Sequence, residues 1–427
     1  MCEMKDSGIE WVGAIPQNWQ LSKIGSLYTQ RNEKVSDKDY QPLSVTMQGI
    51  LPQLATAAKT DDGDNRKLVR VGDFAINSRS DRRGSCGISP LDGSVSLINI
   101  ILTPRTAMHP GYYNWLFHTT LFADEFYKWG HGIVADLWTT RWQEMKSITV
   151  PVPEYAEQER IAAFLDAECA EIDAVLEKTR ASIEEYKKLK QAVITQAVTK
   201  GIRGDRPMKN SGIEWIGEIP AEWRKTQLRH CAAIKSGITL GKKYEKTDSL
   251  VERPYLRVAN VQDGYVDLSV LTTIEVTQDE DLKYRLRAGD VLMTEGGDRD
   301  KLGRGCVWHG EIEPCLHQNH IFAVQTSKDT LLPEFLEYLT VSDVGRSYFD
   351  VTAIKTTNLA CTSSSKVLAF TIPLPSVEEQ AEIVEALNTK CAGIDALVAK
   401  KQQYLTEIEN YKKSLIYEYV TGKKEVV

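Results

Sequence analysis

The residues best suited to bind a metal lie close together in the third quarter of the chain. Two cysteines and three histidines fall within one short stretch: Cys306, His309, Cys315, His317 and His320. These residue types are the usual zinc ligands, but structural zinc sites place their cysteine pairs closer together. On a strand, Cys315 and His317 would share one face while His320 points to the other. The spacing favours ordinary strand packing with polar contacts over a zinc site, and we expect no metal in this chain.

Motifs for nucleotide binding and for catalysis on nucleic acids are incomplete. The segment Gly237–Lys243 resembles a phosphate-binding loop, but it has three residues between its glycines where that loop requires four. The chain has no Pro-Pro pair, which adenine methyltransferases need, and no Pro-Asp pair, which common restriction nucleases place before Asp/Glu-x-Lys. We therefore expect no catalytic residue and no enzymatic activity in this chain.

Basic side chains gather beside glycine in two short loops. Arginine forms paired hydrogen bonds with guanine and also binds phosphate, so such loops are candidate contacts for nucleic acid. The candidates are Arg79, Arg82 and Arg83 in the first loop and Arg299, Lys301 and Arg304 in the second. We add Arg141 and Lys355, which occupy similar stretches farther along. Aspartates also lie in both loops (Asp81, Asp298 and Asp300), so solvated surface charge is the alternative for these side chains.

The elements that would position these loops occur twice in the chain. The segment Ser7–Gly13 returns as Ser211–Gly217 with one conservative change, at an offset of 204 residues. Four tryptophans belong to this repeat: Trp11, Trp19, Trp215 and Trp223. Because both halves share them, we interpret these tryptophans as structural or partner-binding residues. Internal repeats of this length indicate a tandem duplication.

A second repeated block is helical. It begins with Pro-x-Pro at Pro151 and returns at Pro373, at an offset of 222 residues that holds for about forty residues. Apolar or small residues recur at alternating spacings of three and four, as in Leu165, Cys169, Ile172 and Leu176 in the first copy and Leu387, Cys391, Ile394 and Val398 in the second. This spacing predicts two long helices with a coiled-coil seam. The alternative is that each helix packs on its own core, but their equal length favours pairing with each other.

Between the repeated blocks lie two stretches that differ much more from each other. We refer to residues 1–150 and 202–372 as the two heads. Both contain a Gly-Asp pair before an apolar run, and short β-rich runs separated by Gly, Pro and Asp predict mixed, strand-rich domains. Two matched helices suit the binding of two copies of one partner, whereas two unlike heads suit contact with two different parts of a ligand. A split, asymmetric DNA site fits this division.

Composition limits the class of protein without favouring DNA. A chain of 427 residues is too long to fold around one hydrophobic core, and 42% of its residues are apolar. The longest apolar run considered as a membrane span, Leu97–Leu102, is far shorter than a membrane helix. Eight cysteines without a C-x-x-C pair indicate a reducing cytoplasm. The net charge is −7, and residues 1–150 carry 16 basic and 16 acidic side chains. DNA binding must therefore come from local basic loops or partly from a partner.

The ordered combination of these motifs resembles the specificity subunits of type I restriction–modification systems. The matching features are Ser-Gly-Ile-Glu-Trp followed by Ile-Pro and Trp, the Gly-Asp pair in each head, and the Pro-x-Pro, Glu-Gln and Ile-Asp of each helix. The resemblance covers essentially the whole chain. It implies that double-stranded DNA is read as a bipartite, asymmetric site by a non-catalytic chain. It also implies two methyltransferase (modification) subunits and two restriction/translocase subunits as partners, which would bind S-adenosylmethionine, ATP and Mg²⁺.

The resulting expectation is an α+β protein with a pseudo-two-fold tandem repeat. Residues 1–150 and 202–372 would be target-recognition domains, and the helical regions 151–201 and 373–427 would form the antiparallel coiled coil that the resemblance implies. The runner-up function is a coiled-coil scaffold that holds two partner modules without reading DNA.

Overall fold

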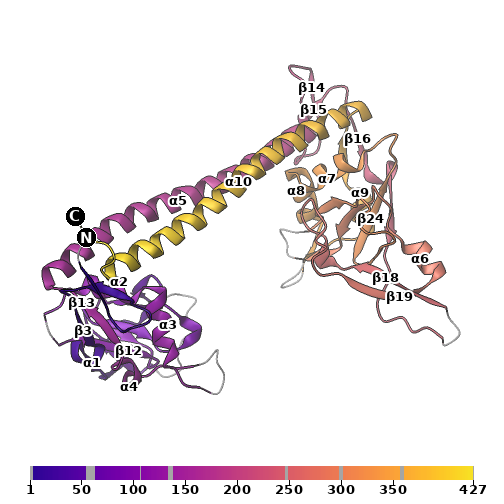
Figure 1. Cartoon of the computed structure of the whole chain (residues 1–427). Coiled ribbons are helices and arrows are strands. Elements are labelled where there is room, and N and C mark those ends of the chain that lie inside the picture. The colour runs from indigo at the N-terminus through magenta and orange to yellow at the C-terminus, as the bar shows by residue number, and fades with distance from the viewer. Residues whose placement is uncertain are drawn as a thin grey trace. The chain divides into compact units, whose positions relative to one another are not determined.

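The computed structural model describes residues 3–53, 63–105, 107–132, 138–245, 249–297, 302–355 and 360–426. The chain forms two compact units (Figure 1). Unit 1 combines Met1–Arg180 with the C-terminal stretch Gln402–Val427, whereas unit 2 is the continuous stretch Ala181–Lys401. Each unit therefore contains one head together with part of each long helix.

Unit 1 is rich in short antiparallel strands. Among its described residues, the largest sheet has the order β10 (Cys86–Ile88), β9 (Phe74–Asn77), β12 (Asn99–Pro104) and β4 (Tyr28–Arg31). A second sheet has the order β11 (Gly93–Val95), β8 (Arg66–Val69) and β5 (Lys34–Val35). Three strand pairs are β1 (Met4–Asp6) with β2 (Ala14–Pro16), β13 (Thr149–Val152) with β3 (Gln20–Lys23), and β6 (Leu43–Thr46) with β7 (Gly49–Pro52). The helices of this head are α1 (Ile24–Leu27), α2 (Pro110–Phe117), α3 (Thr120–Lys128) and α4 (Trp142–Met145).

Unit 2 follows the same plan with one more described strand. Its four-stranded antiparallel sheet has the order β17 (Ala232–Ser236), β24 (Ile321–Thr326), β20 (Val291–Thr294) and β22 (Gly305–Val307). Two three-stranded sheets contain β19 (Thr272–Thr277), β18 (Leu250–Leu256) and β23 (Leu316–His317), and β21 (Gly296–Gly297), β26 (Ala360–Cys361) and β25 (Ile354–Lys355). The described strand pairs are β14 (Met208–Asn210) with β15 (Glu218–Pro220) and β16 (Arg224–Gln227) with β27 (Thr371–Leu374). The helices of this head are α6 (Gln278–Tyr284), α7 (Pro333–Val341), α8 (Asp343–Thr352) and α9 (Ser364–Ala369).

The central sheets of the two heads correspond strand for strand, with β10-β9-β12-β4 in unit 1 matching β22-β20-β24-β17 in unit 2. The repeated Gly-Asp pair forms the turn before the matching strands β9 and β20. Gly72 and Gly289 have φ of 86° and 94°, a conformation that favours glycine. The carboxylates of Asp73 and Asp290 each accept a backbone N–H from the residue three positions earlier, at 2.9 and 3.0 Å. The predicted mixed fold shared by both heads is therefore confirmed.

The long helices are α5 (Tyr155–Lys200) and α10 (Val377–Val420). Each begins two residues after a Pro-x-Pro segment and carries acidic residues in its first turn, where they interact favourably with the helix dipole. A repeated glutamine ties each long helix to its head. The Oε1 atoms of Gln158 and Gln380 accept the backbone N–H groups of His109 and Leu332 at 2.9 and 2.8 Å, and these residues cap α2 and α7. No described helix is long and apolar enough to cross a membrane.

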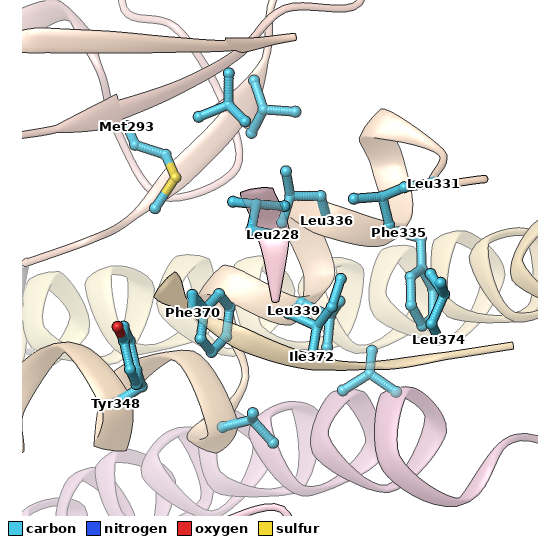
Figure 2. Packing of buried hydrophobic residues seen from close by; sticks show 14 of the residues in the cluster. Leu228, Met293, Leu331, Phe335, Leu336, Leu339, Tyr348, Phe370, Ile372 and Leu374 are labelled. Atoms are coloured by element: carbon cyan, nitrogen blue, oxygen red, sulfur yellow. The ribbon is translucent and has the colours of Figure 1, made fainter. Parts of the chain in front are cut away.

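In both units, head and long helices share one hydrophobic core. Figure 2 shows the unit 2 core around Leu228, Phe335, Leu339 and Phe370. Helix residues in this core are Ile194 and Val198 of α5 and Ile383 and Leu387 of α10. The corresponding residues of unit 1 are Ile161 and Leu165 of α5 and Leu415 and Val420 of α10. Burial of one such side chain contributes about 1.5–3 kcal/mol, so several of them hold each helix end firmly on its head.

Within each unit, α5 and α10 run antiparallel and are joined by ion pairs. In unit 2, Lys190 Nζ lies 2.7 Å from Asp395 Oδ2; in unit 1, Lys412 Nζ lies 2.6 Å from Asp173 Oδ1. Lys412 is the repeat counterpart of Lys190, and Asp395 is that of Asp173, so the duplication reproduces the same bridge. This antiparallel register agrees with the coiled coil that the family resemblance implied.

The predicted seam is confirmed. On α5, Leu165, Cys169, Leu176, Thr179, Ile183 and Ala197 are buried, and Ile172, Tyr186 and Val193 are half-buried. On α10, Leu387, Cys391 and Leu415 are buried, and Ile394, Val398, Lys401, Leu405, Ile408 and Tyr419 are half-buried. The three-four spacing therefore identified the face on which the helices pair.

Candidate nucleic-acid and partner interfaces

The loop between β9 and β10 carries three predicted DNA-contacting arginines, and they differ in their partners. Arg79 is half-buried, and its Nε lies 3.0 Å from Asp81 Oδ1. Arg79 therefore fits the alternative that the sequence raised, a surface charge balanced by a neighbouring aspartate. Arg82 is exposed and has no ion-pair partner within the described part of the chain. Of these two side chains, Arg82 is therefore the one available to a ligand.

Arg83 and Arg141 differ in whether their side chains are held by contacts within their own head. Arg83 forms an ion pair with Asp124 of α3, and its guanidinium lies 5.6 Å from the ring centroid of Tyr127. Both contacts hold this side chain on its own head. Arg141 is exposed and caps the start of α4, where its backbone N–H donates to Glu144 Oε2 at 2.9 Å. Its side chain thus remains a candidate contact.

The predicted contacts of the second head are described only in part. Arg299 and Lys301 lie outside the described residues. The backbone of Lys355 ends β25, and its side chain is also outside the described part. Arg304 is half-buried just before β22. The DNA-contacting role of these four residues remains a prediction.

Backbone hydrogen bonds identify which positions correspond in the two heads. Thr140 N donates to Ser78 O at 2.9 Å, and Thr362 N donates to Glu295 O at 2.7 Å, each just after the central strand. The residue after each threonine is the N-cap of a helix, so the counterpart of Arg141 is Ser363. Arg141 and Lys355, which the sequence placed in equivalent stretches, are therefore not at equivalent positions.

The Cys and His residues considered for zinc have separate environments. Cys306 and Cys315 are buried in an apolar cluster, as the packing interpretation predicts. Burial lowers the pKa of His317 to about 4 and keeps its ring neutral. His320 Nδ1 instead pairs with Glu295 Oε2 at 2.5 Å. Among the described residues, no three His, Cys, Asp or Glu side chains are arranged to hold a metal.

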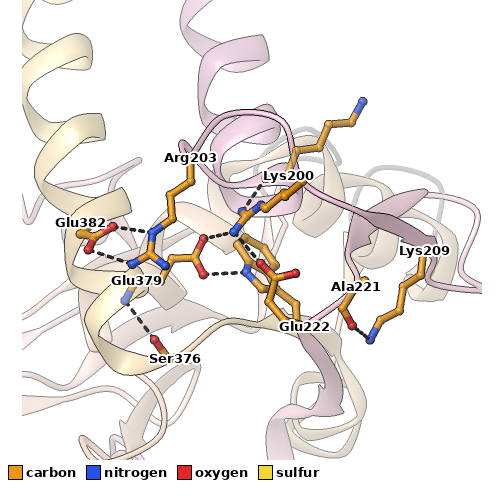
Figure 3. Close-up of polar contacts among 10 residues, drawn as sticks. Lys200, Arg203, Lys209, Ala221, Glu222, Ser376, Glu379 and Glu382 are labelled. Atoms are coloured by element: carbon orange, nitrogen blue, oxygen red, sulfur yellow. Dashed lines mark hydrogen bonds and ion pairs between the residues drawn. The ribbon is translucent and has the colours of Figure 1, made fainter.

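The repeated tryptophans lie in or against the cores of their units. Trp19 and Trp223 are each 1% exposed and Trp11 is 7% exposed, whereas Trp215 is half-buried. A side chain with 1% exposure offers a partner no contact surface, so we reassign Trp19 and Trp223 from partner binding to the core. Figure 3 shows the polar contacts around Glu379, whose Oε2 accepts the Trp223 indole N–H at 2.9 Å and whose Oε1 pairs with Arg206.

A second stripe on each long helix, largely apolar and exposed, was missed at the level of sequence. It consists of Val175, Ser182 and Leu189 on α5 and Leu397, Tyr404 and Tyr411 on α10. These positions are spaced by seven, and the second set repeats the first at an offset of 222. The five apolar or aromatic members are 40–55% exposed, whereas the polar Ser182 is half-buried. Exposed apolar residues at heptad spacing suit the docking of another helix. The available signal was that four of them, Val175, Ser182, Leu397 and Tyr404, lie one residue before a seam position.

In unit 2, residues of the head and of the two long helices line an open pocket of about 920 Å³. Its lining includes Ile194 and Val398 of the long helices, Asp263 and Tyr265 of a turn, and Glu337 of α7. Burial, assisted by the nearby carboxylates of Glu334 and Asp263, raises the pKa of Glu337 to about 7. Glu337 is therefore partly protonated near neutral pH.

This raised pKa predicts that Glu337→Gln stabilises unit 2 at alkaline pH. A carboxyl whose pKa is higher in the folded chain favours folding when protonated, so this stability is lost between pH 4.5 and about 7. The amide has no such loss. We expect the free energy of unfolding at pH 8 to rise by about 2–3 kcal/mol, with little change at pH 4.5. Urea denaturation at both pH values checks this, with Glu334→Gln on the same helix as the control; equal stability of Glu337→Gln and the parent chain at pH 8 would contradict it.

The comparisons with known proteins agree with this architecture, although no family model matches the chain. The type I restriction enzyme EcoKI specificity subunit of Escherichia coli strain K12 is 23% identical over 441 residues, covering 96% of this chain and 90% of that protein. A putative type I restriction enzyme MjaX specificity subunit of Methanocaldococcus jannaschii is 26% identical over 208 residues, 48% of this chain and 47% of that protein. This chain is thus similar to type I specificity subunits, in one case over nearly its full length.

The fold of this chain is also found among solved structures. A chain from a structure on complex assembly and conformational transition of the type I R-M system has a TM-score of 0.72 and 16% identity. The match covers 96% of this chain and 99% of the solved chain. The fold is therefore shared over nearly the full length.

Proposed function

We propose that this chain is the DNA-specificity subunit of a type I restriction–modification complex and reads a bipartite, asymmetric site. The two target-recognition domains would be residues 1–150 and 202–372. One observation carries the proposal: both heads share a central sheet, yet equivalent positions beside it carry different side chains, such as the exposed Arg141 in one head and the half-buried Ser363 in the other. Unlike side chains on one scaffold suit two different half-sites, because base edges are distinguished by their hydrogen-bonding groups.

The duplicated helices support a partner that binds twice. Unit 1 carries Val175 and Tyr411 on its exposed stripe, and unit 2 carries their repeat counterparts Leu397 and Leu189. The third pair differs, because Tyr404 of unit 1 corresponds to Ser182 of unit 2. Largely equivalent surfaces suit two copies of one subunit.

We assign these surfaces to two methyltransferase subunits, with two restriction/translocase subunits completing the complex. S-adenosylmethionine, ATP and Mg²⁺ would bind to those partners, while this chain supplies no catalytic group.

The proposal is tested by adding the cognate modification subunit to the purified chain. The chain alone should neither bind S-adenosylmethionine nor methylate DNA, because it has no methyltransferase motif. The complex should methylate adenine within one bipartite sequence of a random duplex library. Methyl transfer by the chain alone would contradict the non-catalytic role.

The second candidate is a scaffold that holds two partner modules without reading DNA. Its support is the net charge of −7 and the engagement of Arg79 and Arg83 by aspartates of their own head. The same library separates the two functions. A complex that assembles but binds all duplexes equally would favour the scaffold.

A further inference from the structure

The junction between head and long helices in unit 2 has one carboxyl without an ionic partner. Glu337 lines the pocket, and the neighbouring Tyr338 hydroxyl donates to Asn388 Oδ1 of α10 at 2.7 Å. Among the described residues, no Lys, Arg or His forms an ion pair with Glu337. Of the carboxyls that line the pocket, only Glu337, on the head helix, has no ion pair among the described residues, and the long helix provides the carboxamide of Asn388.

The corresponding junction of unit 1 has the same two groups in exchanged positions. Asn114 of α2 occupies the position of Glu337, and the Trp115 indole N–H donates to Asp166 Oδ1 of α5 at 2.8 Å. Asp166 is the repeat counterpart of Asn388 and is exposed, and it too has no ion pair within the described chain. At these two positions, each junction therefore has one carboxyl without an ion pair among the described residues, although the position that provides it differs.

Other charges around the unit 2 pocket are paired internally. The pairs are Lys190 with Asp395 at 2.7 Å, Lys187 with Glu184 at 2.7 Å and Arg346 with Asp263 at 3.6 Å. Glu337 has a hydrogen bond with the Val307 backbone but no cationic partner among the described residues, and burial makes a negative charge without such a partner costly there. The side chains of Ile194, Val341 and Ile394 add apolar lining. A carboxyl in such surroundings suits a cationic side chain whose alkyl stem contacts the apolar residues.

We propose that each junction receives a lysine or arginine side chain from the subunit that binds the duplicated helices. This inference rests on the proposed function and adds to it the electrostatic contact of that partner. Because both carboxyl groups are negatively charged when ionised, they disfavour the binding of DNA phosphates at either junction. Occurrence at both junctions fits a partner present in two copies, and a pocket of about 920 Å³ has room for more than one partner side chain.

The test uses the full chain and its cognate modification subunit, with assembly measured by mass photometry over a range of concentrations. Glu337→Gln should weaken binding of one partner copy by about tenfold, the low end of a hydrogen bond between charged groups. Asp166→Asn should weaken the other copy similarly. Glu334→Gln is the matched control for the first change and should leave both copies bound.

Exchange of the two groups gives a sharper test. The double variant Glu337→Gln/Asn388→Asp places the carboxyl where unit 1 has it and should restore most of the lost affinity. Asn114→Asp/Asp166→Asn should do the same in unit 1. Because Glu337→Gln is expected to stabilise its unit, weaker assembly of this variant would not reflect unfolding.

The outcomes separate this inference from the proposed function. If the parent chain bound no modification subunit, the proposed partnership itself would fail. If the parent bound two copies and both single variants assembled within twofold of it, the junction contact would be wrong and the partnership would stand. If Glu337→Gln lost affinity for the modification subunit and the double variant did not restore that affinity, the proposed contact would also be overturned.

Discussion

Replacing Arg82 by alanine should weaken recognition of one half-site and leave the other unchanged. The side chain is exposed in the loop after β9 and has no ion-pair partner among the described residues. A lost paired contact with a base costs about 1–3 kcal/mol, which is roughly five- to 150-fold in affinity. The measurement is binding of the assembled complex to duplexes in which each half-site is altered separately.

Arg70→Ala is the matched control for this change. Arg70 belongs to the same head but lies in the turn before β9, and its Nη1 is 2.8 Å from Asp92 Oδ2. The length of the strand separates it from the Arg82 loop, so half-site affinity should be retained. Equal loss at both half-sites in Arg82→Ala, or no loss at either, would show that this loop does not read bases. The parallel prediction for Arg304→Ala concerns the other half-site.

Lengthening both long helices should change the spacer between the half-sites. We would insert seven residues after Ile183 in α5 and seven after Lys401 in α10, positions that the Lys190–Asp395 register places opposite each other. Seven residues keep the three-four seam and add ~10.5 Å, the length of about three base pairs. Three base pairs also turn the duplex by roughly 100°, so the fit is imperfect. We expect the preferred spacer to grow by about one to three base pairs, with reduced affinity.

A four-residue insertion at the same two places is the control. It interrupts the seven-residue repeat, so seam residues such as Leu176 and Leu405 no longer share one face with those beyond the insertion. We expect a greater loss of binding than with seven residues. The measurement is binding to duplexes that differ only in spacer length. An unchanged optimum for an intact seven-residue variant would show that the helices do not set the spacing.

Strand positions were predictable in outline, and local hydrogen bonds decided their ends. The apolar run Ile321–Val324 became β24, which continues to Thr326. The run from Ser96 became β12, which starts only at Asn99 because the Asn99 backbone and side-chain N–H groups both donate to Ser96 O. This turn depends on a side-chain orientation that hydrophobic alternation does not reveal.

The sequence by itself determined the duplication, the two long helices and their seam. Offsets of 204 and 222 residues and a three-four spacing are properties of residue order, so they need no knowledge of contacts. Only the tertiary structure decided which predicted side chains are available. Asp124 lies 41 residues from Arg83 and engages it, while Arg82 remains exposed. Trp19 became buried, and Glu337 came to face a pocket that residues of both long helices line. Such contacts join residues distant in the chain, and residue spacing cannot specify them.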